Sequence, residues 1–258
     1  NNLKNLKKGF IKKNINNLFN IEYNSSTNVL INNEEKNIKF TLSDINSRIL
    51  ITGTEINSWT FEIDGSSFYK NLKDKNISSY VESRLTGCLT FMDVKLKNIN
   101  LKSNYSLCED SFNFIRAQGK INSVEINDSL SDAIDFDFSN IEIASLIIRK
   151  AKNDCIDMSF GIYKIDSALL YNCGDKGISV GEKSILNIEN VEITKANIGI
   201  ASKDSSIVNV KNSVIKAENC FASYRKKQEF SGSILRYKKT NCNVGEFMIQ
   251  KGSLIVKQ

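Results

Sequence analysis

The stretch that decides the fold repeats itself at a fixed step: DAIDFDFSNIEIASLIIRKAKN (132–153), DCIDMSFGIYKIDSALLYNCGD (154–175), KGISVGEKSILNIENVEITKAN (176–197) and the start of a fourth step, IGIASK (198–203). A fixed period of roughly 20 residues that is rich in Ile, Val and Asn is typical of a strand-based solenoid with one coil per repeat. The pattern predicts an all-β fold, a right-handed parallel β-helix with about 22 residues per coil. Its apolar anchors are Phe112, Ile134, Ile156, Ile178, Ile200, Ala222 and Val244.

The two faces of each strand follow from this register. Successive side chains of a strand alternate between faces, so Ile134 and Phe136 point inward while Asp135 and Asp137 point outward. Residues one period apart in a parallel stack lie about 4.8 Å apart. We therefore expect Asp135 and Asp157 to be nearest neighbours on the outside, with Asp137 beside them.

The residues that precede each strand form two further rows. The nearer row begins Asp110, Asp132, Asp154, Lys176. One position earlier lie Asn153, Asp175, Asn197, Asn219 and Asn241. Asn tolerates left-handed backbone, and its amide can bond the coil above, so Asn is expected at the corners of a coil. We interpret Asn197, Asn219 and Asn241 as structural corner residues.

The chain is expected to form one domain. Residues 1–30 are interpreted as an N-terminal cap or lead-in and residues 31–258 as the β-helix, with an irregular insertion near 64–88 and regular coils over 88–250. The apolar spacing in residues 1–20 is helix-like and predicts a short helical cap, because an open solenoid end needs covering; binding to a membrane surface is the alternative for this basic segment. A second short helix is expected over 78–85, and 224–229 should project as a loop.

Composition and charge restrict the partners. No apolar run approaches the length of roughly 18 residues that a spanning helix needs, so no membrane span is expected. The net charge is +6, and its Lys and Arg clusters are not interleaved with aromatic residues as in nucleic-acid-binding segments, so we expect no nucleic-acid partner. Two interpretations of the Lys and Arg clusters remain open: a basic face that contacts only water, or a surface that binds a polyanionic polysaccharide.

The six cysteines have no metal-binding spacing, and the chain has no His to complete a metal site. Cys220 and Cys242 lie one period apart, which allows a disulfide. We expect instead that they are stacked apolar thiols inside the coil.

An acidic cluster is the candidate functional site. Three Asp share two adjacent outward rows, although Asp is depleted in strands. Such a cluster can bind Ca²⁺, for which Asp135, Asp137 and Asp157 are the candidate ligands. It can also supply paired acids for glycoside hydrolysis, or face water in ion pairs with Lys and Arg. The candidate substrate-binding residues around it are Asn153, Asp157, Asp175, Ser179, Lys203 and Arg225, with Glu182 nearby.

Two reactions are open for this cluster. In a hydrolase, Asp154 is the expected acid, with Asp132 or Asp135 as its partner. In a lyase, Lys176 would abstract the proton α to a uronate carboxylate, which Ca²⁺ would neutralise. A lysine base needs a lowered pKa, which nearby aspartates oppose.

About 75 residues of this region resemble the polygalacturonase family, whose successive coils read N-T-D-G, D-D-C, G-H-G-I-S and G-I-R-I-K. The matching segments here are Ser131–Asp135, Asn153–Asp157, Asp175–Ser179 and Gly199–Lys203. The resemblance puts Asp132 and Asp154 at two of the three catalytic Asp positions and Lys203 at the family's Lys. Asn153, Lys176 and Ala201 stand where the family has Asp, His and Arg. Since Asn is no general base and the chain has no His, the resemblance implies the fold and a glycan partner rather than that reaction.

The same coils, from Asp135-Phe136-Asp137-Phe138-Ser139 to Gly199-Ile200-Ala201-Ser202-Lys203-Asp204, look like a group of bacterial right-handed β-helix repeat proteins. This resemblance implies exported, polysaccharide-related work at an extracellular, cell-surface or periplasmic location. The primary hypothesis is thus a polysaccharide-binding or polysaccharide-modifying β-helix, a hydrolase or lyase of uronate polymers if it is an enzyme. The alternative is a non-catalytic surface or scaffold solenoid. The first predicts a groove over 132–182, and the second a flat face on which every Asp is paired with Lys or Arg.

Overall fold

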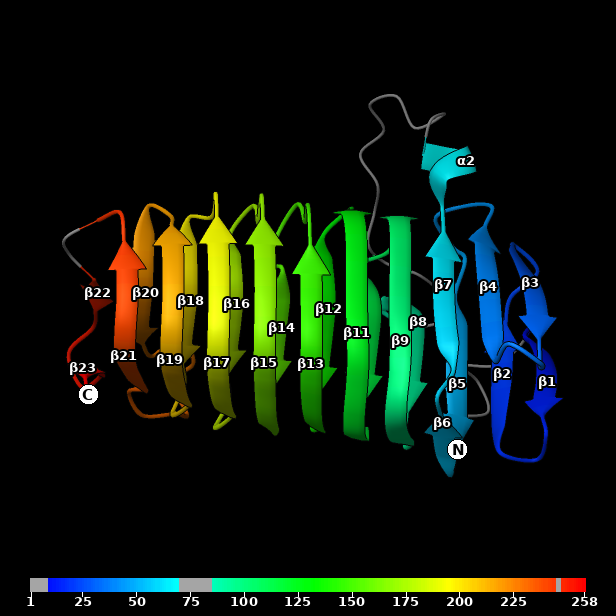
Figure 1. The fold of residues 1–258 in the computed structure, drawn as a ribbon, viewed down its shortest axis with the longest axis horizontal. Helices are drawn as coiled ribbons and strands as arrows, with labels where there is room; N and C mark the ends of the chain where they lie inside the picture. The colour runs from blue at the N-terminus through cyan, green and yellow to red at the C-terminus, as the bar shows by residue number, and fades with distance from the viewer. Residues whose placement is uncertain (1–8, 70–84, 245–246) are drawn as a thin grey trace.

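The described part of the chain is a stack of β-strand coils. The computed structural model describes residues 9–69, 85–244 and 247–258. It forms a parallel β-solenoid of about 9 turns with about 22 residues per turn, as the periodicity predicts. In Figure 1 the chain advances from right to left, with the near strands of the coils pointing up and the far strands pointing down, which is a right-handed coil.

Two sheets form the walls of the solenoid, and each regular coil contributes one strand to each sheet. Sheet A contains, in spatial order, β1 (Ile11–Ile15), β2 (Phe19–Tyr23), β5 (Ile49–Gly53), β8 (Gly87–Met92), β10 (Asp110–Ile115), β12 (Asp132–Asp137), β14 (Ile156–Ser159), β16 (Lys176–Gly181), β18 (Ile198–Lys203), β20 (Asn219–Tyr224) and β22 (Met248–Ile249). Sheet B contains β3 (Thr27–Asn32), β4 (Asn37–Leu42), β7 (Thr60–Asp64), β9 (Lys95–Ser106), β11 (Gln118–Ser129), β13 (Asn140–Ile148), β15 (Ile162–Tyr171), β17 (Ile185–Thr194), β19 (Ile207–Lys216), β21 (Ile234–Cys242) and β23 (Leu254–Lys257), with β6 (Glu55–Asn57) pairing β9.

The register of the central coils is the predicted one. Ile134 pairs with Ile156, Ile156 with Ile178, and Ile178 with Ile200, and each of these side chains is fully buried. Burying one such side chain contributes roughly 1.5–3 kcal/mol, so the ladder of identical anchors holds neighbouring coils in register. A slip by one residue would turn every inward side chain outward.

The register changes between β18 and β20. Ile200 pairs with Phe221, and Ala201 pairs with Ala222, so this step is one residue shorter than the steps from β10 to β18 in the same sheet. The anchors Ala222 and Val244 were therefore wrong: Phe221 fills the interior, Ala222 continues the outward row, and Val244 lies outside any strand. The aromatic ring of Phe221 points inward and is large enough to pack against Tyr237 and Phe247.

The N-terminal end is closed by strands. β1 pairs antiparallel with β2, which pairs antiparallel with β5, and β3 pairs antiparallel with β4. The helical cap was thus wrong for residues 9–20, and residues 1–8 lie outside the described part. The physical reason is that the first coil exposes unpaired backbone groups, which a strand satisfies and a helix does not.

Two departures from regular coils interrupt the stack. After β7 the chain forms the single turn α2 (Ser66–Tyr69), and the helix predicted over 78–85 falls, except for Leu85, outside the described residues. Residues 225–233 form a loop between β20 and β21; it contains the predicted positions 225–229, whereas Tyr224 still belongs to β20. No helix in the described ranges is long and apolar enough to cross a membrane.

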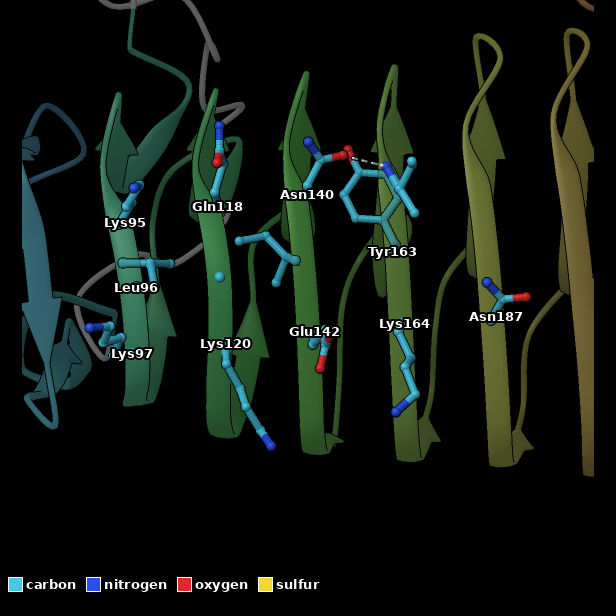
Figure 2. A pocket seen from close by; sticks show the side chains of 13 residues that line it. Lys95, Leu96, Lys97, Gln118, Lys120, Asn140, Glu142, Tyr163, Lys164 and Asn187 are labelled. Atoms are coloured by element: carbon cyan, nitrogen blue, oxygen red, sulfur yellow. Dashed lines mark hydrogen bonds between the residues drawn. The ribbon is translucent and has the colours of Figure 1, made fainter.

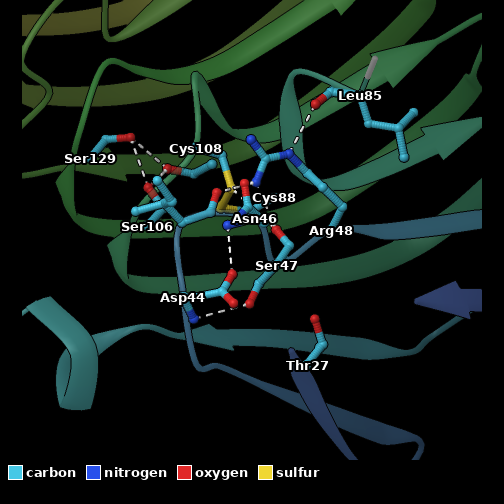
Figure 3. The surroundings of a disulfide bond; sticks show 12 residues. Thr27, Asp44, Asn46, Ser47, Arg48, Leu85, Cys88, Ser106, Cys108 and Ser129 are labelled. Atoms are coloured by element: carbon cyan, nitrogen blue, oxygen red, sulfur yellow. Dashed lines mark hydrogen bonds between the residues drawn. A yellow bond between two sulfur atoms is a disulfide. The ribbon is translucent and has the colours of Figure 1, made fainter. Parts of the chain in front are cut away.

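Three disulfides cross-link the coils: Cys88–Cys108, Cys155–Cys173 and Cys220–Cys242. The expectation of stacked free thiols was wrong, because the coil brings the Cα atoms of the last pair to 6.1 Å, within disulfide range. Figure 3 shows the first disulfide beside Arg48, whose buried guanidinium donates to the carbonyls of Ile45 and Leu85. Burial lowers the pKa of Arg48 to about 10, against the attraction of nearby acids such as Asp110.

Candidate functional site on the outward face of sheet A

The strand register assembles the predicted acidic cluster. Asp135 on β12 pairs with Asn113 on β10 and with Asp157 on β14, and Asp157 pairs in turn with Ser179 on β16. Asp132 likewise pairs with Asp110. Acids that lie one coil apart in the chain therefore become neighbours on one outward face, as expected.

Two of these acids support the corner of the coil. One carboxylate oxygen of Asp132 accepts the backbone N–H of Asp154 at 2.8 Å, and one oxygen of Asp154 accepts the N–H of Lys176 at 2.9 Å. Each carboxylate thus satisfies a backbone donor at the start of the next coil, which is a structural role. Asp154 is only 4% exposed, so the residue predicted to be the acid of a hydrolase is largely hidden.

The C-terminal half of the face is paired with cations. The Lys176 ammonium lies 3.4 Å from Asp154 and contacts Asp175, and the Lys203 ammonium lies 3.7 Å from Asp157. Burial lowers the pKa of Lys176, but the hydrogen bond to Asp175 and the charges of Asp154 and Asp175 outweigh burial and leave that pKa above its ordinary value. Lys176 is therefore a poor general base, which counts against the lyase.

Glu182, at the corner that follows β16, also has polar partners. Glu182 accepts a hydrogen bond from Ser159 at 2.7 Å and lies 2.5 Å from the ammonium of Lys227 in the 225–233 loop. Burial alone would raise the pKa of Glu182, but these partners lower it. The loop is thereby tied to the margin of the acidic face.

The N-terminal half of the face contains acids that form no ion pair with a described residue. None of Asp110, Asp132, Asp135 and Asp137 forms an ion pair with a lysine or arginine in the described part of the chain. The amide of Asn113 donates to Asp135 at 2.9 Å and reaches Asp137 at 3.4 Å. These four carboxyls form the uncompensated acid cluster of the protein.

Burial and mutual repulsion raise the pKa values of this cluster. Burial, followed by the charges of Asp154 and Asp157, raises the pKa of Asp132 to about 7 against the hydrogen bond from the Asp154 N–H. Burial and neighbouring acids raise the pKa of Asp110 and Asp135 well above the ordinary value and raise that of Asp137 as well. With a pKa of about 7, Asp132 is partly protonated at neutral pH and can then donate a hydrogen bond.

Buried polar atoms without a hydrogen-bond partner lie along the same rows. They are Thr90 Oγ1, Asp110 Oδ2, Asn113 Oδ1 and Ser179 Oγ, and all four residues are at most 2% exposed. An unsatisfied buried polar group costs roughly 1–3 kcal/mol. Thr90 and Asn113 were not among the predicted site residues, although the coil step from Asp135 back to Asn113 would have located the second.

An exposed aromatic pair borders the acids. Phe138 and Phe160 follow β12 and β14 directly, stack with ring centroids 4.7 Å apart, and are 54% and 40% exposed. Both have a positive φ, near 50°, which is uncommon for a bulky residue. Phe230 of the 225–233 loop approaches Phe160 at 6.1 Å. An apolar ridge therefore lies along one margin of the acidic face.

The remaining predicted residues lie at the periphery. Asn153 is exposed beside Asp132, and Arg225 is exposed in the loop after β20 without an ion pair to a described residue. Calcium bound by Asp135, Asp137 and Asp157 stays a prediction. Over the described ranges, no group of three or more His, Cys, Asp or Glu side chains is placed to hold a metal ion.

Comparisons with protein families, with curated proteins and with solved structures find no match to this chain. The resemblance to polygalacturonases and to bacterial β-helix proteins therefore stays a prediction beyond the solenoid fold itself.

Proposed function

We propose that this protein binds an extended polysaccharide along the outward face of sheet A, centred on Asp132, Asp135 and Asp137. The observation that carries the proposal is the uncompensated acid cluster, in which Asp132, Asp135 and Asp137 are partly exposed and form no ion pair with a lysine or arginine among the described residues. Sugar hydroxyls donate to carboxylates and accept from protonated carboxyls, so a glycan would supply partners for these three groups. The β-solenoid fold alone does not indicate that the protein binds a polysaccharide.

The shape of the face supports an extended ligand. Parallel strands place equivalent side chains about 4.8 Å apart along the solenoid axis, which is close to the advance of a linear glycan per sugar ring. The apolar ridge of Phe138 and Phe160 runs in the same direction and would contact sugar C–H groups. A rigid row of repeated sites requires little rearrangement on binding.

The charge of the cluster favours an uncharged stretch of polysaccharide at this face. A uronate carboxylate would be repelled by Asp135 and Asp137 unless a cation such as Ca²⁺ lay between them. If the protein cleaves its ligand, hydrolysis fits better than elimination. Asp132, with its pKa near 7, is the better-placed acid, and Asp135 is its partner. Asp154 and Lys176 are occupied by each other.

The test compares the wild type with the Asp135→Asn/Asp137→Asn double variant on a panel of neutral and acidic oligosaccharides, by calorimetry and by release of reducing ends. We expect the double variant to lose at least about tenfold in affinity, roughly 1.4 kcal/mol. Asp166→Asn is a control outside the site, because Asp166 lies on sheet B, is half-buried and is paired with Lys164. The absence of glycan binding by the wild type, or unchanged binding by the double variant, refutes the proposal.

A scaffold solenoid without a ligand is the second candidate. It is favoured by the ion pairs of Asp154, Asp157 and Asp175, which satisfy half of the face internally. It predicts that Asp135→Asn/Asp137→Asn raises the unfolding free energy while no glycan binds. The two candidates are thus separated by one set of variants.

We also propose that the protein works outside the cytoplasm, in an extracellular, cell-surface or periplasmic location. Three disulfides support this, because disulfides persist in oxidising compartments. Alkylation and mass spectrometry of protein taken from its native source would check it. Six free thiols in the native protein would contradict it.

A further inference from the structure

A groove crosses the outward face of sheet B, the wall that does not carry the acids. It has a volume of about 740 Å³ and runs across β9, β11, β13, β15 and β17, along the solenoid axis. Figure 2 shows its two margins: Lys95, Gln118 and Asn140 on one side, and Lys97, Lys120, Glu142, Lys164 and Asn187 on the other.

Strands β9 and β11 pair irregularly under the groove. The pairing with β9 shifts register between Gly119 and Ile121 and again between Ile121 and Ser123. Gly119 has φ +119°, and a Cβ atom there would lie 2.1 Å from the carbonyl oxygen of Leu96. Only glycine fits this position, because any side chain would collide with the backbone of Leu96 on the neighbouring strand.

The charge of the groove is opposite to that of the acid cluster. Lys97 is paired with Glu55 and Lys164 with Asp166. Lys95 and Lys120 are exposed, and neither ammonium has an ion pair or hydrogen bond with a residue in the described ranges. The two lysines lie on neighbouring strands, on opposite margins of the groove, so a free ammonium is available on each margin at this end.

The amides add hydrogen-bonding capacity. The side-chain carbonyl oxygen of Asn140 accepts the N–H of Ile162 at 3.0 Å, which leaves its NH₂ group for a ligand. Gln118 lies between Lys95 and Asn140 in strand register, and its side chain makes no hydrogen bond to a described residue. Ile162, 58% exposed, supplies an apolar surface at the end of this margin.

We propose that this groove binds a carboxylated polysaccharide, independently of the proposed site on sheet A. The carboxylates of the polysaccharide would pair with Lys95 and Lys120, and its hydroxyl groups would form hydrogen bonds with Gln118 and Asn140. Glu142, which pairs in register with Lys120, repels a more densely charged polymer.

The groove fits a glycan better than a peptide. The floor is the face of a sheet, whose backbone groups already bond to the neighbouring strands. An extended peptide would leave its own N–H and C=O groups unpaired there. Hydroxyl groups, in contrast, are satisfied by amide and ammonium side chains.

The experiment measures binding of oligogalacturonate, as the carboxylated probe, to the wild type and to Lys95→Gln/Lys120→Gln at several salt concentrations. We expect the double variant to bind at least about tenfold more weakly and to show a smaller dependence on salt. Lys152→Gln/Lys216→Gln removes the same charge from two exposed lysines outside the groove and should leave binding unchanged. Circular dichroism confirms that each variant is folded.

Other probes separate this groove from its competitors. Asp135→Asn/Asp137→Asn should leave oligogalacturonate binding intact, so failure of the site on sheet A would not affect this result. Heparin or single-stranded DNA binding as tightly, with the same loss in Lys95→Gln/Lys120→Gln, would show a general anion surface and overturn the proposal. No binding of oligogalacturonate by the wild type, or an equal loss in the lysine control, would overturn it as well.

Discussion

Asp135 differs from an ordinary strand aspartate in what surrounds it. Its neighbours in register are Asn113 and Asp157, and Asp137 and Asp110 lie beside it, so its carboxylate has acids and one amide around it and no cation among the described residues. Asp135 is half-buried, and both this burial and the charges of the neighbouring acids disfavour its ionised form. A residue that opposes folding when ionised is often kept for function.

This acid cluster predicts that the protein becomes less stable as the pH rises. The pKa of Asp132 is raised to about 7 in the folded protein, whereas an unfolded Asp has a pKa of about 3.9. The stabilising contribution is complete below pH ~4 and is lost as the pH rises through ~7, by about 1.4 kcal/mol for each unit of pKa difference. Urea unfolding at pH 4.5, 6 and 7.5 measures this trend.

The variant Asp132→Asn removes the titrating group and keeps an oxygen that can accept the Asp154 N–H. We expect it to flatten the pH dependence and to be more stable than the wild type at pH 7.5. A wild-type unfolding free energy that rises between pH 4.5 and 7.5, with no change in Asp132→Asn, would contradict the prediction.

At the scale of elements, each disulfide joins two cysteines that are about one coil apart in the chain. Cys155–Cys173 closes a segment with a sequence separation of 18 that contains β14 and β15, the strands that carry Asp157 and line the sheet B groove. Closing a loop of this size stabilises the folded state by about 3 kcal/mol in the chain-entropy description.

We therefore expect Cys155→Ala/Cys173→Ala to lose about 2–4 kcal/mol of unfolding free energy, measured by guanidinium denaturation. Phe112, Phe114 and the coils before β12 keep their own packing, so a folded protein should remain. Equal stability of the variant and the wild type under non-reducing conditions would show that the disulfide adds nothing to the coil.

At the scale of the whole molecule, stability is a sum over neighbouring coils. Strands β12 to β18 are bonded on both sides in sheet A, while β22 and β23 at the C-terminal end have a neighbour on one side. Met248, Ile249 and Leu254 at that end are exposed, whereas the N-terminal end is closed by antiparallel strands.

Hydrogen exchange should reveal this gradient. We expect amides of β22 and β23 to exchange orders of magnitude faster than those of β14 and β16, because local opening needs fewer broken contacts there. Mass spectrometry of peptides from each coil measures it. Uniform protection from β10 to β23 would mean that the solenoid opens as one cooperative unit.

The sequence by itself determined the repeat length of the coil, the inward Ile ladder and the meeting of Asp135 with Asp157, because a parallel register converts a fixed period directly into neighbourhood. It did not determine the shorter coil before Phe221, the strand cap, the disulfides or the groove at Gly119. Nor did it show which acids pair with lysines. These features depend on how coil corners absorb one residue more or less and on where long side chains come to lie between coils, and only the folded stack decides that.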